Sequence, residues 1–392
     1  DVYKRQNNMY EFKKTEDQEL LLESLKEIYE RNDLDAYFKE CDEKHEFPQK
    51  AIDVMVDAGF ATLGIPEQYG GTEVDILTQC MVVEQACALG FPNLCWMNFA
   101  CEVDDMLAFG SPEQQAETMK NAMTGTKPFS LGFTEPNAGS DNSAMSTRAE
   151  HRDGKVYING QKTFITYADR VPYMLLMARN YENEIPQKDM SMYWLPMNTP
   201  GVKVTPLDKI GQHMINSCEV YLENVVLDES ALVGKKGRGF FQLMKNFEVE
   251  RLMSTAMNVG MAQAAYEEAA RYATERVQFG KTIGSFQLTQ EKIINMAIKI
   301  ENMRNMVYHY AWMKQNGMSI ATESAMAKYY TSRAAFEVVD DAMQIMGGIG
   351  YTNDVRIARL WRDCRLSRIM AGTDEIMVHI AGRALLKEFA NK

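Results

Sequence analysis

The spacing of hydrophobic and polar residues divides the chain into three parts. Between residues 16 and 32, apolar side chains recur on one face of a helix: Leu20, Leu21, Leu25, Ile28 and Tyr29. Ser111 followed by Pro112, with acid in the first turn, predicts the start of another helix. Residues 1–125 are therefore predicted to form an all-α domain. Its residues 1–8, ahead of Met9, are expected to be non-native or disordered.

From about residue 126 the pattern changes to short runs in which apolar and polar residues alternate. Asn159-Gly160 separates two such runs in KVYINGQKTFIT and predicts a hairpin turn. The stretches VPYMLLMARN, MSMYWLPMN and SCEVYLENVVL continue as short strands bounded by Pro, Gly and Asn. Residues 126–236 are therefore predicted to form a β domain, either a barrel or a sandwich.

Helical spacing returns from residue 237 to the end of the chain. Three long stretches with glycine stops, and a shorter one from Gly372 onward, predict a four-helix bundle. The expected fold class is α+β, with an N-terminal helical domain, a middle β-barrel or sandwich domain, and a C-terminal helical bundle domain over residues 237–392.

Composition and charge narrow the classes of partner. A net charge of −12 argues against a nucleic-acid partner. We expect no membrane partner, because no apolar run approaches the length of a membrane span and no signal peptide opens the chain. The seven cysteines form no CxxC pair, so we expect no metal and a cytoplasmic location in which thiols stay reduced.

Three segments carry a family resemblance. FTEPNAGSD (133–141) leaves an apolar run through small and polar residues, and by itself it also fits an ordinary turn. Together with QIMGGIGYTNDVRIARLWRD (344–363), ERVQFGKTIGSFQLTQEK (275–292) and the α-β-α order, it resembles the acyl-CoA dehydrogenase family. The resemblance runs from about Thr15 to the C-terminus. Within the family, the amino-acid sequence is most similar to the crotonobetainyl-CoA reductase branch.

The resemblance implies FAD as the cofactor. Thr134 would bind the flavin pyrimidine edge, Ser140 the pyrophosphate, and Phe164 and Thr166 the ring system. Arg276 would serve the FAD of an adjacent subunit, which implies a homotetramer. The implied cofactor-binding residues are Thr134, Gly139, Ser140, Phe164, Thr166, Arg276, Gln278, Phe279, Gln287, Gln344, Gly347, Gly348, Thr373 and Glu375.

The catalytic base expected from the resemblance is missing from its usual position. Many relatives have a glutamate directly before Gly-Thr of the C-terminal segment, where this chain has Ala371. Glu250 in NFEVERLMST resembles the base of other relatives. We expect it to be the base, with the backbone N–H of Ala371 holding the thioester carbonyl. On its own helix no cation lies at i±3 or i±4, and Arg251 can meet Glu248 instead, so an apolar face should raise the pKa of Glu250.

The substrate implied is an acyl-CoA or enoyl-CoA thioester, with an electron-transferring flavoprotein as electron partner. Candidate substrate residues are Ser140, Arg251, Trp96 and Phe99. The pair Trp96 and Phe99 beside Glu102 would suit a quaternary ammonium group such as that of crotonobetainyl-CoA or γ-butyrobetainyl-CoA, although such a stripe is more often core.

Three alternatives remain open at this point. The chain is either an enzyme that oxidises the acyl form or reduces the enoyl form, or a catalytically silent flavin- or acyl-CoA-binding homologue that acts as a complex subunit. A helical scaffold without a cofactor would leave ERVQFG and FTEPNAGSD unexplained.

Overall fold

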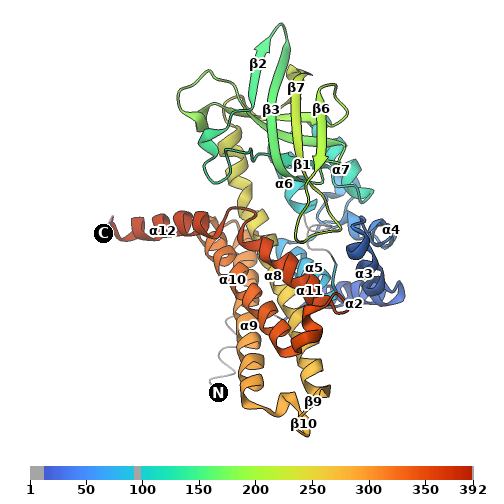
Figure 1. The fold of residues 1–392 in the computed structure, drawn as a ribbon. Coiled ribbons are helices and arrows are strands. Elements are labelled where there is room, and N and C mark those ends of the chain that lie inside the picture. The colour runs from blue at the N-terminus through green and yellow to red at the C-terminus, as the bar shows by residue number, and fades with distance from the viewer. Residues whose placement is uncertain (1–12, 92–98, 391–392) are drawn as a thin grey trace.

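The computed structural model describes residues 13–91 and 99–390, with only the backbone described for residues 99–101 and the side chain of 388 also omitted. Its order is helical, then sheet, then helical, as predicted (Figure 1). The N-terminal helices are α2 (Glu16–Arg31), α3 (Leu34–Lys44), α4 (Gln49–Asp57), α5 (Ile76–Leu89), α6 (Phe99–Phe109) and α7 (Pro112–Met123). Residues 1–8 and Trp96 lie outside the described residues.

Helix starts in this part follow local sequence. Ser111 caps α7 by accepting a hydrogen bond from the Gln114 N–H, with Pro112 at the first helical position, so the predicted start is confirmed. In α2 the buried face contains Leu22, Leu25, Ile28 and Tyr29, whereas Leu20 is 55% exposed. The predicted face was therefore wrong at Leu20, which points to solvent and not to the core.

The middle part is one eight-stranded sheet with the order β6-β7-β3-β2-β4-β5-β8, and β1 pairs in parallel with β4. Its strands are β1 (Phe129–Gly132), β2 (Arg148–Arg152), β3 (Lys155–Thr166), β4 (Tyr173–Arg179), β5 (Met190–Pro196), β6 (Val202–Pro206), β7 (Ser217–Asp228) and β8 (Leu232–Val233). The inner face is apolar and carries buried side chains such as Ile158, Leu176 and Val220. This domain lies beyond one end of the helical bundle (Figure 1).

The predicted hairpin at Asn159-Gly160 is wrong. These residues lie inside β3, which is one strand of 12 residues. The register with β7 shifts between Ile158 and Gly160, and the Asn159 side chain accepts a hydrogen bond from the Asn224 N–H over 2.7 Å. The pair therefore forms a bulge instead of a turn. The hairpin turn lies at Asp153-Gly154, where φ is 52° and 71° and both residues suit a two-residue loop.

The C-terminal part contains α8 (Gly239–Glu275), α9 (Gln287–Gln315), α10 (Ala321–Met346), α11 (Arg356–Cys364) and α12 (Asp374–Ala390), with the short strands β9 (Val277–Gln278) and β10 (Lys281–Thr282) between α8 and α9. The short helix predicted from Gly372 onward is α12, which projects away from the long helices (Figure 1). The sequence pattern did not predict α11.

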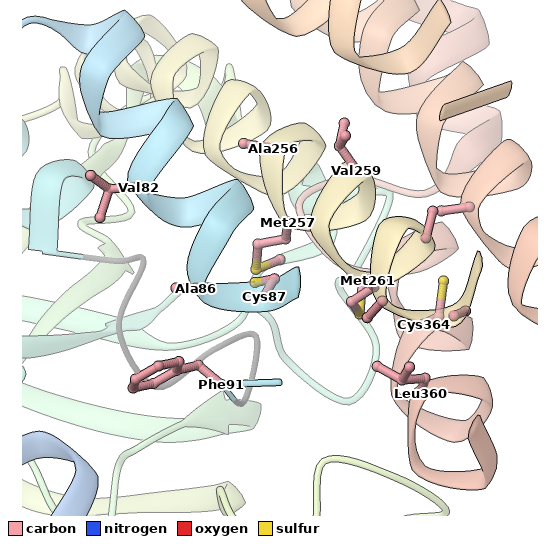
Figure 2. Close-up of a cluster of buried hydrophobic side chains, with 14 of the residues drawn as sticks. Val82, Ala86, Cys87, Phe91, Ala256, Met257, Val259, Met261, Leu360 and Cys364 are labelled. Carbon is pink, nitrogen blue, oxygen red and sulfur yellow. The ribbon is translucent and has the colours of Figure 1, made fainter. Parts of the chain in front are cut away.

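Helix α8 packs closely against α5 of the N-terminal part (Figure 2). Small and flexible side chains meet there, including Ala86 and Cys87 on α5 and Met257 on α8. A Cβ on Gly260 would lie 2.3 Å from the Glu84 carbonyl oxygen, so the two backbones touch at that glycine. This contact holds the middle of α8 against α5. No helix in the described ranges is long and apolar enough to cross a membrane.

Candidate active site around Glu250

Glu250 lies on α8, half-buried, one turn before the buried residues Met253 and Ser254. Burial raises the pKa of its carboxyl, whereas Arg251, Lys127 and Lys328 lower it, and the net direction is upward. The expected rise is present, and none of the opposing cations lies at i±3 or i±4 on α8. Two of the opposing cations come from other elements, where helical spacing within α8 cannot reveal them.

Helix α6 brings three further acids to this region. Glu102 forms an ion pair with Lys127 in which both side chains are 10% exposed, and the second carboxylate oxygen of Glu102 is buried without a hydrogen-bond partner. Asp105 accepts a hydrogen bond over 2.7 Å from Asn246 on α8, one turn before Glu250. Burial raises the pKa of Glu102 to about 7, of Asp104 to about 6 and of Asp105 to about 8. The repulsion between Glu250 and both Glu102 and Asp105 shows that these carboxyls face one region.

The FTEPNAGSD segment reaches α8 at the same place. The ring of Phe133 packs edge-on against that of Phe247, with centroids 6.3 Å apart. The next residue, Thr134, accepts a hydrogen bond from the Thr163 N–H over 3.0 Å, which joins the segment to β3. The carbonyl oxygen of Thr166 at the end of β3 accepts a hydrogen bond over 2.6 Å from Ser130 on β1. Phe133 thereby connects the segment to the helical turn that precedes Glu250, whereas Thr166 is held against β1.

A buried ion pair beneath this segment holds it against the sheet. Lys162 is fully buried, and it donates to the Glu135 carboxylate over 2.8 Å and to the Phe133 carbonyl over 3.1 Å. Glu135 also accepts hydrogen bonds from the backbone N–H groups of Ser146 and Thr147. Burial by itself would raise the pKa of Glu135, but Lys162 and these donors lower it, so the pair is ionised.

Phe164 presents an aromatic surface beside Thr134. It lies within the second register shift of β3, has φ of 58°, and its side chain is 67% exposed. A large apolar ring held open in a left-handed conformation carries a cost unless something covers it. Gly139 and Ser140 are exposed, and a Cβ on Gly139 would only reach van der Waals distance of Thr134. Thr134, Gly139, Ser140 and Phe164 therefore offer hydroxyl groups, accessible backbone and one exposed aromatic ring. A planar ligand can bind to such groups.

The turn at Ala371 is joined to α10. Ala371 and Gly372 have φ of 52° and 89°, and Lys328 on α10 donates to the Gly372 carbonyl over 2.6 Å. The charge of Lys328 acts on Glu250, which places both groups at one site. Thr373 caps α12 by accepting from the Ile376 N–H over 3.3 Å, whereas the carboxylate of Glu375 is exposed.

The environment of Arg251 differs from the expectation. Its predicted contact with Glu248 was wrong, because Glu248 accepts hydrogen bonds from Lys314, Ser319 and the Ile320 N–H instead. Arg251 is 6% exposed, lies over the ring of Phe247 with 5.8 Å to its centroid, and has its Nε buried without a partner. Of the other candidate substrate residues, Trp96 lies outside the described residues and only the backbone of Phe99 is described, at the start of α6.

A second set of predicted residues lies far from Glu250 in this chain. Arg276 follows α8, and at about 1.5 Å per residue roughly 40 Å of helix separates it from Glu250. Phe279, in the β9–β10 hairpin at the end of the molecule away from the sheet, is 94% exposed (Figure 1). The remaining members of this set are exposed as well: Gln278, Gln287, Gln344, Gly347 and Gly348. One chain therefore does not bring the two sets together.

Sequence reasoning missed several residues that shape the site. Lys127, Asp105, Lys162 and Lys328 follow no motif that was recognised, and only Glu102 was noted. Lysine inside apolar stretches such as AMAKYYTS was the available signal for Lys328, since lysine is almost never fully buried without a function or a partner. The partners themselves lie far along the chain and are brought close only by folding.

Comparison with known proteins identifies the family. Three family models match in succession: the acyl-CoA dehydrogenase N-terminal domain over residues 15–126, the middle domain over 130–225 and the C-terminal domain over 237–386. "Probable acyl-CoA dehydrogenase YdiO" of Escherichia coli strain K12 is 47% identical over 383 residues, which are 97% of this chain and 100% of that protein.

Solved structures share the fold. The glutaryl-coenzyme A dehydrogenase in complex with glutaryl-CoA has a TM-score of 0.90 and 28% identity, covering 96% of each chain. A chain from the structure described as "Electron transferring flavoprotein of Acidaminococcus fermentans: Towards a mechanism of flavin-based electron bifurcation" has a TM-score of 0.89 and 33% identity, covering 96% of this chain and 99% of that one. The chain therefore belongs to the acyl-CoA dehydrogenase family, whose cofactor is FAD.

Proposed function

We propose that the protein is an FAD-dependent oxidoreductase that acts on the α,β carbon–carbon bond of an acyl-CoA or enoyl-CoA thioester. Glu250 is the catalytic base, and the backbone N–H of Ala371 holds the thioester carbonyl. Two observations support this proposal: Phe247, one turn before Glu250, packs against Phe133 of the FTEPNAGSD segment, and Lys328, whose charge acts on Glu250, donates a hydrogen bond to the Gly372 carbonyl next to Ala371. We also propose the three domains 1–125, 126–236 and 237–392.

Thr134, Gly139, Ser140, Phe164 and Thr166 form what we call the Thr134 surface, and these residues fit a flavin. Phe164 offers an exposed ring, Thr134 and Thr166 offer hydroxyl and backbone groups, and Gly139 and Ser140 leave room for a pyrophosphate. When bound, the flavin supplies a two-electron acceptor for the hydride that leaves the β-carbon. The protein's part is to hold the thioester and to move the α-proton.

Glu250 suits removal of an α-proton because its pKa is raised. A carboxylate with a raised pKa is a stronger base and accepts a proton more readily. Burial raises the pKa of Glu250 here. As the α-proton leaves, negative charge develops on the thioester oxygen. A preorganised backbone N–H at Ala371 would stabilise that charge, and it needs no side chain at position 371.

The position of the second set of residues supports a homotetramer with shared cofactor sites. Arg276, Gln278, Phe279, Gln287, Gln344, Gly347 and Gly348 cannot reach the Thr134 surface of their own chain. In a second copy they would supply forked donors and aromatic cover for the FAD. Exposed apolar side chains in the same part of the molecule support an interface there: Phe279 at 94%, Tyr351 at 83% and Leu288 at 77%.

The acyl group that fits best is a cationic one. On α6, Glu102 and Asp105 both interact with the charge of Glu250, and Asp104 is a third buried acid on the same helix; the cations Lys127 and Lys314 act on Glu102 and Asp104. One carboxylate oxygen of Glu102 is buried without a partner. A quaternary ammonium, as in γ-butyrobetainyl-CoA or crotonobetainyl-CoA, would be attracted to that oxygen, because the ion pair with Lys127 uses the other one. We propose this pair as substrate and product, in either direction, with Trp96 and Phe99 as candidate contacts.

An electron-transferring flavoprotein is the electron partner that we propose. The structural likeness to a chain from an electron transferring flavoprotein structure of Acidaminococcus fermentans supports that choice. The free cysteines Cys41, Cys80, Cys87, Cys218 and Cys364 support a cytoplasmic location, where thiols stay reduced.

Glu250→Gln tests the assignment of the base. The variant should purify with FAD and bind thioester, because neither needs the carboxylate. Flavin reduction by γ-butyrobetainyl-CoA should fall by about 10²-fold or more. Glu267→Gln, on an exposed face of the same helix, is the matched control and should react as the unmodified protein does. Undiminished turnover in Glu250→Gln would reject Glu250 as base.

A panel of thioesters separates the enzyme from a silent homologue. Butyryl-, crotonyl-, γ-butyrobetainyl- and crotonobetainyl-CoA are mixed with the oxidised or reduced protein, and the flavin spectrum is followed. Bleaching or reoxidation by one of them supports the enzyme. A flavin that responds to no thioester would favour the alternative of a catalytically silent complex subunit.

A further inference from the structure

Lys328 is a buried cation with an unusual partner. Its side chain lies on α10 with 0% exposure, and it donates a hydrogen bond over 2.6 Å to the backbone carbonyl of Gly372. Among the described residues, no carboxylate lies within 4.0 Å of its ammonium group. Removing an ammonium group from water costs several kcal/mol when no anion is paired with it. A buried lysine directed to a backbone carbonyl therefore needs a reason other than stability.

The carbonyl that it contacts belongs to a strained turn. Ala371 and Gly372 are consecutive residues with positive φ, 52° and 89°. Ala is strained in the left-handed region, so the surrounding structure has to hold it there. A side chain at Gly372 would be strained, because φ is 89° and a Cβ would lie 2.6 Å from the methyl carbon of Met377, which would have to shift.

A second anchor on α10 holds the other side of the same turn. Ser332, one helical turn after Lys328, donates to the carboxylate of Asp374 over 2.9 Å. Arg368 donates to the other oxygen of Asp374 over 2.8 Å. Lys328 and Ser332 share one face of α10 because they are four residues apart. This face therefore fixes the turn at two points, on either side of Thr373.

We propose that Lys328 is a positioning residue for the reaction: it holds the Ala371–Gly372 turn in the conformation that presents the Ala371 N–H to the thioester carbonyl. The inference rests on the proposed function, because it assumes the role of that N–H. Lys328 touches neither acid nor thioester in this role. It acts through the backbone of the turn.

The charge of Lys328 gives the residue a second, separable effect. Burial raises the pKa of Glu250, and the ammonium of Lys328 is one of the cations that limit the rise. The other charged groups that face Glu250 are Arg251 on α8, Lys127 before β1, and Glu102 and Asp105 on α6. Lys328 itself faces Asp374, Arg251, Glu375 and Arg368. Removal of its charge should therefore raise the pKa of Glu250 further.

Two substitutions separate the hydrogen bond from the charge. Lys328→Met removes both and leaves an apolar side chain of similar length in a buried place, so the fold should be retained. Lys328→Gln removes the charge but keeps an N–H donor for the Gly372 carbonyl. Lys299→Met is the control, because Lys299 lies on α9 in an ion pair with Glu337 at the surface of the bundle.

Flavin content, kcat, KM and the pH dependence of kcat/KM are measured with one thioester for each variant. In Lys328→Met we expect full flavin content and kcat lower by about 10²-fold, the size of an oxyanion donor's contribution. Lys328→Gln should recover at least tenfold of that loss. In both variants the acidic limb of the pH profile should move to higher pH, while Lys299→Met should match the unmodified protein.

Equal kcat and an unmoved acidic limb in both variants would overturn the inference. If Lys328→Met fails to fold, the comparison of Lys328→Gln with Lys299→Met decides in the same way, since a kcat and pH profile equal to the control would refute it. Glu250→Gln is run in parallel. Normal Lys328 variants beside an inactive Glu250→Gln would reject only the positioning role, whereas an active Glu250→Gln would reject the proposed function.

Discussion

Lys127 forms an ion pair with Glu102, and both side chains are almost withdrawn from solvent. Lys127 lies just ahead of β1 in the chain and Glu102 on α6, so the pair joins the sheet to the helical part. The ammonium also lies over the ring of Tyr167, 5.4 Å from its centroid. Lys127 also opposes the rise that burial causes in the pKa of Glu250. One lysine therefore lowers the pKa of two acids at the candidate active site.

Replacing Lys127 by Met should move the pH profile of the reaction. Burial raises the pKa of Glu250, and loss of the cation raises it further. The base must be ionised to accept a proton, so the acidic limb of kcat/KM should shift by about one unit to higher pH. Lys120→Met, on the exposed side of α7, is the control. A Lys127→Met profile that overlays the control would contradict this role.

Binding of a cationic thioester should strengthen as the pH rises. Burial places the pKa of Glu102 at about 7 and that of Asp105 at about 8, so both are mostly protonated at low pH and ionised above pH 8. A quaternary ammonium interacts with the ionised forms, so its affinity should rise about tenfold between pH 6 and 8.5. Titration calorimetry with γ-butyrobetainyl-CoA measures this rise.

Butyryl-CoA is the control ligand for the same titration, since its acyl group has no charge to respond to these acids and its CoA part is the same. Glu102→Gln should remove part of the rise for the thioester with the cationic acyl group and leave the binding of butyryl-CoA unchanged. An identical pH dependence for both ligands would count against a cationic acyl group.

Loss of the buried Lys162 should destabilise the middle domain and the cofactor surface together. Lys162→Met leaves the Glu135 carboxylate buried without its cation, which costs about 3–5 kcal/mol of unfolding free energy. The bond from Lys162 to the Phe133 carbonyl is also lost, so flavin content should fall. Denaturant unfolding and the flavin-to-protein absorbance ratio measure the two effects. Lys155→Met, in an exposed pair with Asp228, should change neither.

Arg276→Ala should weaken FAD binding and assembly at once. The exposed guanidinium would serve the cofactor of a second copy, so its loss removes contacts from both. Flavin retention and mass by light scattering are the two readouts, with the exposed Arg271→Ala on α8 as control. A fully flavinated tetramer of Arg276→Ala would refute the shared site.

The double variant Glu250→Gln/Ala371→Glu should recover part of the activity that Glu250→Gln loses. Ala371 already has a positive φ, so glutamate there adds little backbone strain, and its carboxylate would face the same site. We expect turnover about tenfold above that of Glu250→Gln, measured with the thioester that the single variant fails to convert. The single variant Ala371→Glu is the control for folding and flavin content.

Local chemistry explains which features of the fold the sequence predicted. Ser111 and Pro112 start α7 because a cap and a fixed φ act within one helical turn. The α-β-α order follows from the period of hydrophobic residues. The hairpin at Asn159-Gly160 was wrong because the choice between a turn and a bulge depends on the facing strand, where Asn224 binds the Asn159 side chain. That partner is not visible in a local pattern.

The amino-acid sequence by itself determined which residues can do chemistry: an acid at position 250, none at 371, and a surface of small and hydroxylated residues around Thr134. Only the tertiary structure decided how strong that acid is and where the turn is held. The pKa of Glu250 depends on burial and on charges within a few ångströms, and Lys127 and Lys328 are far from it along the chain. Coulomb interactions depend on distance in space, which the fold alone sets.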